Sequence, residues 1–296
     1  MVNALSPVRP TSLRCREIRE ADLGAVVDFL TRGFPGRWAS YWTQGLARMA
    51  ALDVPVGYPR FGFMMESANA PIGVILTLYR QSGDAAEPVR CNLSSWYVAR
   101  EFRPYASLLI SFVLKRRDVT YINISPAPQT WPIVEAQGFK RYVAGQFVAL
   151  PALALNGFGF AIEQFSPGAT RAELSDEERR CLVDHAAFGC LSLVCHTPGG
   201  DMPFVFTRFS IRAGRIRLPC VRLIYCRDLA DFTACAGALG RFLLRRGNVA
   251  VLLDANGAVP GLPGFYTERL GRKYFKGAKP PRLGDLAYSE LAVFGP

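Results

Sequence analysis

The chain has 296 residues, of which 50% are hydrophobic and 20% are charged. These proportions exclude a disordered chain, a collagen-like repeat and a disulfide-stapled miniprotein, and the length suits two domains of roughly 100 to 150 residues each. The formal net charge is +11, and five of the 35 cationic side chains are lysines, which leaves 30 arginines. This excess favours anionic partners, either nucleic acid, phosphorylated cofactors or anionic surfaces.

Cysteine and histidine usage argues against a metal site. The eight cysteines include no C-x-x-C pair and the chain has two histidines, so a zinc site of usual spacing lacks ligands. We expect reduced, mostly buried thiols. Residues 1–10 contain no apolar signal-peptide core, and the longest apolar run, 147–162, is interrupted and too short to cross a bilayer. The sequence therefore predicts a cytoplasmic protein without a membrane span.

The first half predicts strands and helices in the order βααββ and then βαβαβ. Asp22 is the expected N-cap of the first helix, and residues 68–70 are the turn of a hairpin. The predicted strands cover 15–18, 61–67, 71–79, 92–98, 119–124 and 142–150, and the predicted helices cover 22–30, 41–51, 104–117 and 131–137.

The second half repeats part of this order. Its predicted strands cover 190–196, 221–226, 248–253 and 287–294, with a helix at 229–244 and a basic loop at 271–281. The strand at 190 and the pair Arg245-Arg246 both lie 129 positions after their counterparts, the strand at 61 and the pair Arg116-Arg117. Such an offset favours a duplication. We expect an N-terminal domain at 1–150, a linker at 151–175 and a C-terminal domain at 176–296.

Two segments resemble motifs of the GNAT superfamily of acyl-CoA N-acyltransferases. Val98 to Ala106 stands where GNAT proteins have a strand end, the pyrophosphate-binding signature R/Q-x-x-G-x-G/A and a helix. Val134 to Phe139 stands where they have a helix ending in Y-x-x-x-G-F. The resemblance covers 14–150 and, more weakly, 176–295. It implies an α+β fold of tandem GNAT-like domains, with mixed, mostly antiparallel sheets flanked by helices.

The resemblance implies acetyl-CoA or another acyl-CoA as co-substrate and no metal. Its pyrophosphate would meet the helix N-terminus, because unpaired N–H groups and the helix dipole attract anions. The implied cofactor-binding residues are Trp96, Tyr97, Val98, Arg103, Tyr105, Ala106 and Ser107. Pro104 offers no N–H, and Ala106 and Leu108 depart from the signature, so an ordinary Pro-initiated basic helix is the alternative. The second half has no glycine at 225–230, which predicts a non-binding repeat.

The resemblance further implies direct acyl transfer to an amine, with the oxyanion held by a backbone N–H of the strand ending at Val98. Val134 stands in place of the tyrosine that protonates the leaving thiolate in the family. The candidate catalytic residues are Glu66 and Glu101 as bases and Tyr142 as acid, with Tyr97, Ser125 or water as other acids. For both glutamates, a solvated charge at a loop end is the alternative.

Aromatic residues after the first helix suit an acceptor site. Trp38, Tyr41 and Trp42 lie beside Arg37, and clustered aromatics with one cation can hold a small-molecule or peptide amine. An aromatic staple under the helix pair fits the same pattern. Nucleic acid is not expected, because the basic runs end predicted helices without interleaved aromatics. The sequence leaves open whether the protein forms a homodimer.

Two hypotheses of function follow. The first is an acyltransferase. The second is a catalytically silent, GNAT-derived module with a regulatory role or a role in binding acyl-CoA or another ligand. The neighbours Cys195 and His196 are not expected to form a thiol-protease pair, because adjacent strand residues point to opposite faces.

Overall fold

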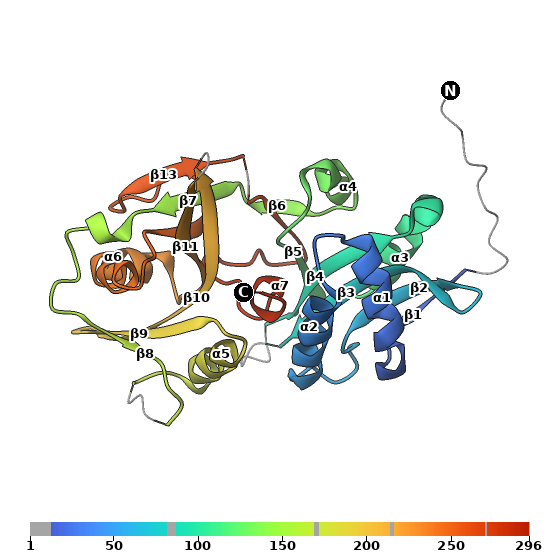
Figure 1. Ribbon diagram of the computed structural model, residues 1–296, viewed down its shortest axis with the longest axis horizontal. Coiled ribbons are helices and arrows are strands. Elements are labelled where there is room, and N and C mark those ends of the chain that lie inside the picture. The colour runs from blue at the N-terminus through green and yellow to red at the C-terminus, as the bar shows by residue number, and fades with distance from the viewer. Residues whose placement is uncertain (1–12, 82–86, 169–171, 214–215, 270, 296) are drawn as a thin grey trace. The chain divides into compact units, whose positions relative to one another are not determined.

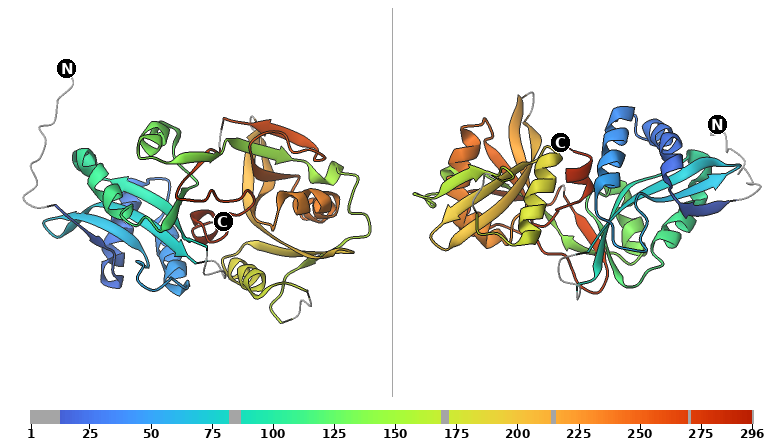
Figure 2. Two further views of the ribbon diagram at one scale, coloured as in Figure 1. Left: turned by 180° about the vertical axis from the view of Figure 1, so that it is seen from behind. Right: turned by 90° about the horizontal axis from the view of Figure 1, so that it is seen from below.

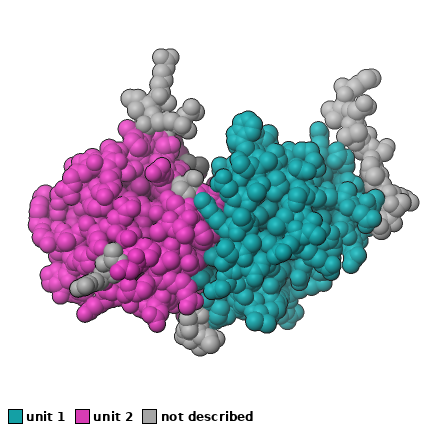
Figure 3. All heavy atoms as spheres, turned by 60° about the horizontal axis from the view of Figure 1, so that its bottom comes forward, with its two compact units in different colours: residues 1–123, 276–278 teal, residues 124–275, 279–296 magenta. Residues whose placement is uncertain are grey.

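The computed structural model describes residues 13–81, 87–168, 172–213, 216–269 and 271–295. It contains two compact units, which Figure 3 distinguishes by colour: unit 1 comprises 1–123 and 276–278, and unit 2 comprises 124–275 and 279–296. The strands form two mixed sheets of seven strands each, which confirms the predicted fold class. The domain limits expected from the repeat, 1–150 and 176–296, remain a prediction. The two units are defined by their compactness, which does not test where a sequence repeat begins and ends.

Unit 1 contains five strands in the order β1-β2-β3-β4-β5 (Figure 1). They are β1 (Arg14–Glu17), β2 (Gly62–Ser67), β3 (Ala70–Arg80), β4 (Val89–Val98) and β5 (Val119–Asn123). Neighbours are antiparallel up to β4, whereas β4 and β5 run parallel. A parallel pair needs a crossover connection, which the helical segment between these two strands supplies.

Helices cover both faces of these strands (Figure 2). They are the 3-10 helices η1 (Glu20–Asp22) and η2 (Arg100–Tyr105) and the α-helices α1 (Leu23–Gly33), α2 (Ala39–Ala51) and α3 (Ala106–Val113). Tyr97 of β4 packs against Phe29 of α1, with ring centroids 5.1 Å apart. On the other face, Val98 of β4 and Leu109 of α3 both border Gly73 of β3. Successive side chains of β4 thus reach α1 on one face and α3 on the other.

The predicted hairpin between β2 and β3 is confirmed. Ser67 pairs with Ala70, and the backbone of Ala68 and Asn69 turns through φ angles of 49° and 63°. Positive φ at both central positions is the geometry of a two-residue hairpin turn that follows the twist of the strands.

Unit 2 holds the complete second sheet, in the order β13-β7-β12-β11-β10-β9-β8. Its strands are β7 (Gly145–Ala149), β8 (Ala161–Gln164), β9 (Leu191–Thr197), β10 (Gly200–Ala213), β11 (Ile216–Tyr225), β12 (Ala250–Ala255) and β13 (Gly264–Thr267). Two further short strands, β6 (Lys140–Val143) and β14 (Lys273–Lys276), pair antiparallel with each other. They are the sixth and seventh strands of the first sheet.

The core of unit 2 lies between the second sheet and α6. The helices of this unit are α4 (Trp131–Ala136), α5 (Asp176–Ala187), α6 (Leu229–Leu244) and α7 (Glu290–Val293), with the 3-10 turns η3 (Pro128–Thr130) and η4 (Pro151–Leu153). Phe204, Phe206 and Phe232 form a buried aromatic group in this core. On the opposite face, Ser192 of β9 donates to the Leu182 carbonyl of α5 at 2.9 Å. No helix in the described residues combines the length and hydrophobicity needed to cross a bilayer.

The second sheet repeats the topology of the strands in unit 1. Strands β8-β9-β10-β11-β12 follow the same order and directions as β1 to β5, with the parallel pair again between the fourth and fifth strands. The pairs β7–β13 and β6–β14 are both antiparallel. The predicted tandem arrangement is therefore confirmed.

The strand predicted at 142–150 is wrong as a single element, because it divides into β6 and β7 in different sheets. The break is at Ala144, whose N–H donates to Oδ1 of Asn256 at 2.6 Å, while Nδ2 of Asn256 donates to the Tyr142 carbonyl at 3.0 Å. β7 then pairs with β12 and β13. This strand of the first half in sequence thereby completes the second sheet, and part of the predicted linker forms its edge strand β8.

Three other predicted elements are corrected. The helix expected at 104–117 is the shorter α3, because Pro104 lies inside the 3-10 turn that precedes it. The basic loop expected at 271–281 contains β14, and the strand expected at 287–294 contains α7 instead. Short apolar runs carry too few residues to separate the periods of a strand and a helix.

Asp22 does not cap α1 as predicted. Its carboxylate accepts hydrogen bonds from the Arg16 guanidinium at 2.6 and 2.8 Å and from the Arg19 N–H at 2.8 Å. Arg16 also donates to Glu66 of β2 at 2.9 Å. The arginine thus joins the start of the helical region to the first two strands.

The small residues of α1 allow a matched test of packing. We expect Gly24→Ala to stabilise the protein by about 0.5–1 kcal/mol, because nothing lies within 4 Å of the added Cβ and alanine favours the helix. Gly33→Ala should destabilise it by about 1–3 kcal/mol, because the added Cβ would lie 2.4 Å from Cδ1 of Tyr97. Urea unfolding measures both, and equal shifts in the same direction would contradict the packing described for Tyr97.

The Arg16–Asp22 ion pair predicts an acid-sensitive stability. Hydrogen bonds from Arg16 lower the pKa of Asp22 to about 2. A lowered folded-state pKa contributes stability above the unfolded value near 4, and this contribution disappears as the pH falls toward 2. We expect Asp22→Asn to lose about 1–2 kcal/mol at neutral pH and to match the wild type at the acid end. Urea titrations between pH 2 and 7 measure this, and the exposed Asp28→Asn is the control, which should parallel the wild type throughout.

Candidate active site

Strand β4 carries an irregularity near its carboxyl end. Val74 pairs with Tyr97 and Leu76 pairs with Ser94, so β4 has one more residue than β3 across this interval. Ser95 lies in this bulge with a φ of 53°, a left-handed conformation that non-glycine residues adopt at an energetic cost. Its hydroxyl lies 2.9 Å from that of Ser94. A bulge locally releases a strand from its ladder and redirects its backbone groups.

The parallel partner of β4 ends before the bulge. The register of β4 with β5 runs from Val89 opposite Val119 to Asn92 opposite Ile122, and β4 continues for six residues beyond it. Along this extension the edge that faced β5 presents backbone N–H and C=O groups that the β5 ladder does not use. Such groups favour hydrogen bonding to an extended ligand or to another segment of chain.

Trp96 adds an unused donor at the same place. Its indole Nε1 is buried and has no hydrogen-bond partner in the described part of the chain. A buried donor without an acceptor costs about 1–3 kcal/mol. Val98, at the strand end, is buried toward α3, and Tyr97 between them packs on α1.

The turn after β4 is basic and leads to an uncapped helix. Arg100 and Arg103 are both exposed in η2. Tyr105 is the N-cap residue of α3 and makes no side-chain capping bond, so Ala106 and Ser107 open the helix without an acceptor side chain at its end. The Ala106 N–H already donates to the Arg103 carbonyl, so the two exposed arginines are what favours an anionic group here.

The aromatic residues of α1 and α2 form a packed cluster. Phe34 lies 5.4 Å from Trp42 and 5.8 Å from Tyr97, measured between ring centroids. Trp42 is 2% exposed and contacts Tyr41 edge to face. These contacts favour the staple that the sequence left as an alternative for Trp42. Trp38 is 83% exposed and remains available to a ligand, and Tyr41 holds the Arg37 guanidinium 4.3 Å from its ring centroid.

The candidate acid–base residues occupy different surroundings. Glu66 is 8% exposed and paired with Arg16, which favours a role in stability. Glu101 is exposed in η2, between Arg100 and Arg103 in sequence. Tyr142 lies in unit 2 and contacts Phe275 edge to face at 6.0 Å.

The position of the family tyrosine is filled by a core residue. Val134 of α4 is 2% exposed, and the adjacent Glu135 accepts a hydrogen bond from Tyr274 at 2.9 Å. Ser125, another acid named from the sequence, donates to Glu290 at 2.6 Å within unit 2. These contacts give the segment around Val134 a structural role.

The second half has the same bulge, but its strand edge is occupied. β11 carries one extra residue at Ile224, and its parallel register with β12 ends at Arg222. The Cys226 N–H donates to the Gly284 carbonyl at 3.0 Å, and the Leu286 N–H donates to the Ile224 carbonyl at 2.7 Å. The C-terminal segment thus takes the backbone groups that β11 would otherwise offer a ligand.

The helix after β11 also differs from α3 at its start. The Asp228 carboxylate accepts from the Ala230 N–H at 2.8 Å, and Asp231 lies in the same first turn of α6. Two carboxylates repel an incoming phosphate and one of them already caps the helix. The missing glycines predict that this half does not bind the cofactor, and these contacts favour the same prediction.

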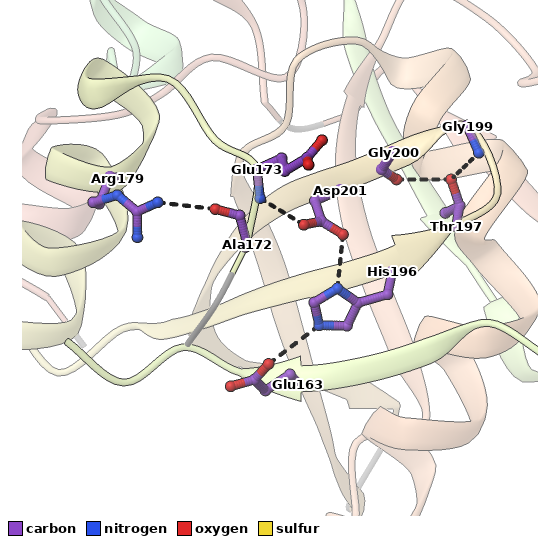
Figure 4. A network of polar contacts seen from close by, with 9 residues as sticks. All are labelled: Glu163, Ala172, Glu173, Arg179, His196, Thr197, Gly199, Gly200 and Asp201. Carbon is purple, nitrogen blue, oxygen red and sulfur yellow. Dashed lines mark hydrogen bonds and ion pairs between the residues drawn. The ribbon is translucent and has the colours of Figure 1, made fainter. Parts of the chain in front are cut away.

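A separate polar network joins β8, β9 and β10 (Figure 4). His196 lies between two carboxylates: its Nδ1 is 2.7 Å from Asp201 and its Nε2 is 3.1 Å from Glu163. Burial alone would lower the pKa of His196, but the hydrogen bonds to Asp201 and Glu163 outweigh it and raise the pKa. Cys195 points to the opposite face, into the core with α6, so it does not pair with His196. The network therefore connects strands, and the thiol-protease interpretation stays excluded.

Sequence reasoning missed the bulge and the covering segment. Two adjacent serines inside an apolar strand are a weak signal for a bulge, because serine is a poor strand former. No sequence signal shows that residues 284–286 pair with β11. Within the described residues no group of three histidine, cysteine or acidic side chains could hold a metal ion.

Neither the family models nor the curated proteins give a match to this chain. Solved structures do. A conserved protein of unknown function from Enterococcus faecalis V583 aligns over 93% of this chain and 74% of its own, with 10% identity and a TM-score of 0.57. A GCN5-related N-acetyltransferase from Anabaena variabilis aligns over 90% and 72%, with 12% identity and a TM-score of 0.56. One from Kribbella flavida aligns over 89% and 70%, with 14% identity and a TM-score of 0.54.

At these identities the comparisons report on fold. The alignments extend over both sheets. The two sheets share one topology, in which the bulged strand is a member of the parallel pair. The chain therefore has the fold of the GCN5-related N-acetyltransferases, in a tandem form.

Proposed function

We propose that the protein is an N-acyltransferase that moves an acyl group from acyl-CoA to a small-molecule or peptide amine, with one site per chain in unit 1. The observation that carries this proposal is the difference between the two equivalent strands. β4 extends past its parallel partner into a bulge followed by a basic turn, whereas the same edge of β11 is taken by residues 284–286.

The chemistry of the site fits a thioester with a phosphorylated carrier. Backbone groups of the β4 extension would hold the extended arm of the co-substrate, and the Trp96 indole N–H would supply a donor for one of its carbonyl groups. Arg103 and the start of α3 would bind the pyrophosphate. A backbone N–H of the bulge would stabilise the oxyanion that forms when the amine attacks the thioester.

The expected proton transfers are assigned to residues of this chain. Glu101 would accept the proton of the attacking amine directly or through water, and Tyr97 of β4 or water would donate one to the leaving thiolate. Tyr142, the acid expected from the sequence, lies in unit 2 and is given no role in this site. Trp38 and Tyr41 would contact the acceptor. Glu66 is the other candidate base, although its ion pair with Arg16 favours a structural role.

Arg103 provides the test of co-substrate binding. We expect Arg103→Ala to weaken acetyl-CoA binding by about three- to tenfold, because an exposed charge-assisted phosphate contact is lost. Calorimetry measures the affinity and the stoichiometry, which should be one per chain. The control Arg32→Ala removes an exposed arginine from the last turn of α1 and should leave affinity unchanged. Equal effects of both variants would place the pyrophosphate elsewhere.

Release of the free thiol tests the reaction itself. With a panel of acyl-CoAs and amines, we expect Glu101→Gln and Tyr97→Phe each to lower the rate by about 10²-fold or more, while acyl-CoA affinity is retained. Glu66→Gln should instead lower the urea midpoint, because Arg16 loses one partner.

Two results would change the assignment. Tight acyl-CoA binding without thiol release above hydrolysis for any pair would favour the silent module. Release that survives all three substitutions would keep the enzyme and reject these residues as its acid and base.

A further inference from the structure

Residues 151–159, here called the strap, pass around α6 on their way from β7 to β8 (Figures 1 and 2). The strap and the following residues to Ile162 contain no charged side chain. Both the strap and α6 lie within unit 2.

The strap is held tightly against the helix. An added Cβ at Gly237 would lie 2.2 Å from the Asn156 carbonyl oxygen, and one at Gly240 would lie 2.2 Å from the Ala152 nitrogen. The Asn156 side chain donates to the Thr233 carbonyl at 2.8 Å and accepts from the Gly237 N–H at 2.9 Å. The two glycines thus admit the strap backbone, and Asn156 fixes its position.

This fixed backbone presents large apolar side chains to solvent. Pro151 and Ala154 are buried, whereas Leu153 is 63% exposed, Leu155 is 89% exposed and Phe158 is 68% exposed. Three such residues within six positions exceed the scattered apolar exposure of an ordinary surface. Ordering them in this way costs conformational entropy, which contact with an apolar environment would offset.

Arginines border the same surface. Arg241 stacks on Phe158, with its Cζ 4.5 Å from the ring centroid, and donates to the Gly157 carbonyl at 2.9 Å. Leu244 lies one helical turn beyond Gly240 and is 48% exposed, and it is followed by the exposed Arg245 and Arg246. Asp231, the acidic residue of α6, and the N-cap Asp228 lie at the other end of the helix.

We propose that the strap and the last turn of α6 dock on an anionic membrane surface. Leu153, Leu155 and Phe158 enter the region between headgroups and acyl chains, while Arg245 and Arg246 contact the anionic headgroups. Separate protruding apolar side chains flanked by arginines match this interface, which is apolar on one side and anionic on the other. This inference goes beyond the proposed acyl transfer and does not depend on it.

A second copy of the chain fits this surface less well. A stable protein interface needs about 20–30 residues a side, whereas this surface offers four large apolar side chains. The formal charge of +11 also opposes contact between two basic surfaces of the same chain. Lipid headgroups supply the opposite charge.

Co-sedimentation with vesicles tests the proposal. We expect the wild type to pellet with phosphatidylcholine vesicles that contain phosphatidylserine and to stay in solution with phosphatidylcholine alone, and added salt should weaken binding. The double variant Leu155→Ser/Phe158→Ser should bind about tenfold more weakly or worse, because its apolar anchors are gone. Arg245→Gln/Arg246→Gln should lose about fivefold per arginine.

Matched variants on other surfaces are the controls. Val56→Ser removes a fully exposed apolar side chain, and Arg117→Gln removes an exposed arginine, both in unit 1. Both should bind as the wild type does. If Leu155→Ser/Phe158→Ser fails to fold, the arginine pair still decides the question.

Three results would overturn the proposal. One is the absence of sedimentation with anionic vesicles, and another is equal binding by the strap variants and the controls. The third is concentration-dependent self-association, seen by analytical ultracentrifugation, that the strap substitutions abolish, because a second copy would then be the occupant.

Discussion

The parallel pairing of β4 and β5 stops after four residues, and the chemistry proposed for this protein depends on that limit. β5 contributes only five residues, so past Asn92 β4 continues into its bulge with β3 as its only strand partner in the described residues. A strand that leaves its ladder must satisfy its backbone groups by other means. The bulge, the Trp96 indole and the basic turn before α3 all lie along this extension, so one early strand end organises a whole site.

The two halves of the chain solve the same backbone problem in different ways. In unit 2, the C-terminal segment hydrogen-bonds to both Ile224 and Cys226, and Asp228 caps the helix that follows. In unit 1, the corresponding helix start lacks a capping side chain and is preceded by two exposed arginines. The two halves of the duplicated fold therefore differ by two backbone hydrogen bonds and one side-chain cap, which satisfy in unit 2 the groups that unit 1 leaves open.

Close backbone approach recurs where distant segments meet inside unit 2. Gly237 and Gly240 let the strap lie on α6, and Gly145 lets β7 pass the Thr267 carbonyl, where a Cβ would lie 2.2 Å from the oxygen. β7 pairs with β12 and β13, which follow it by more than a hundred positions. Glycines at these crossings allow the backbones to approach each other, because a larger side chain would hold them apart.

The sequence by itself determined the local elements and their repetition. The spacing of apolar residues depends on near neighbours in the chain, and it predicted β2, β3, β9 and α6 to within a few positions. The same is true of the turn at Ala68 and Asn69. The near-constant offset between the halves predicted the repetition of these elements. The sequence also placed Arg103 in a basic turn before a helix. The tertiary structure alone decided where β7 pairs, that Asp22 joins Arg16 instead of capping α1, and that residues 284–286 cover β11. Each of these depends on hydrogen bonds between groups distant in sequence, whose formation no local period or propensity encodes.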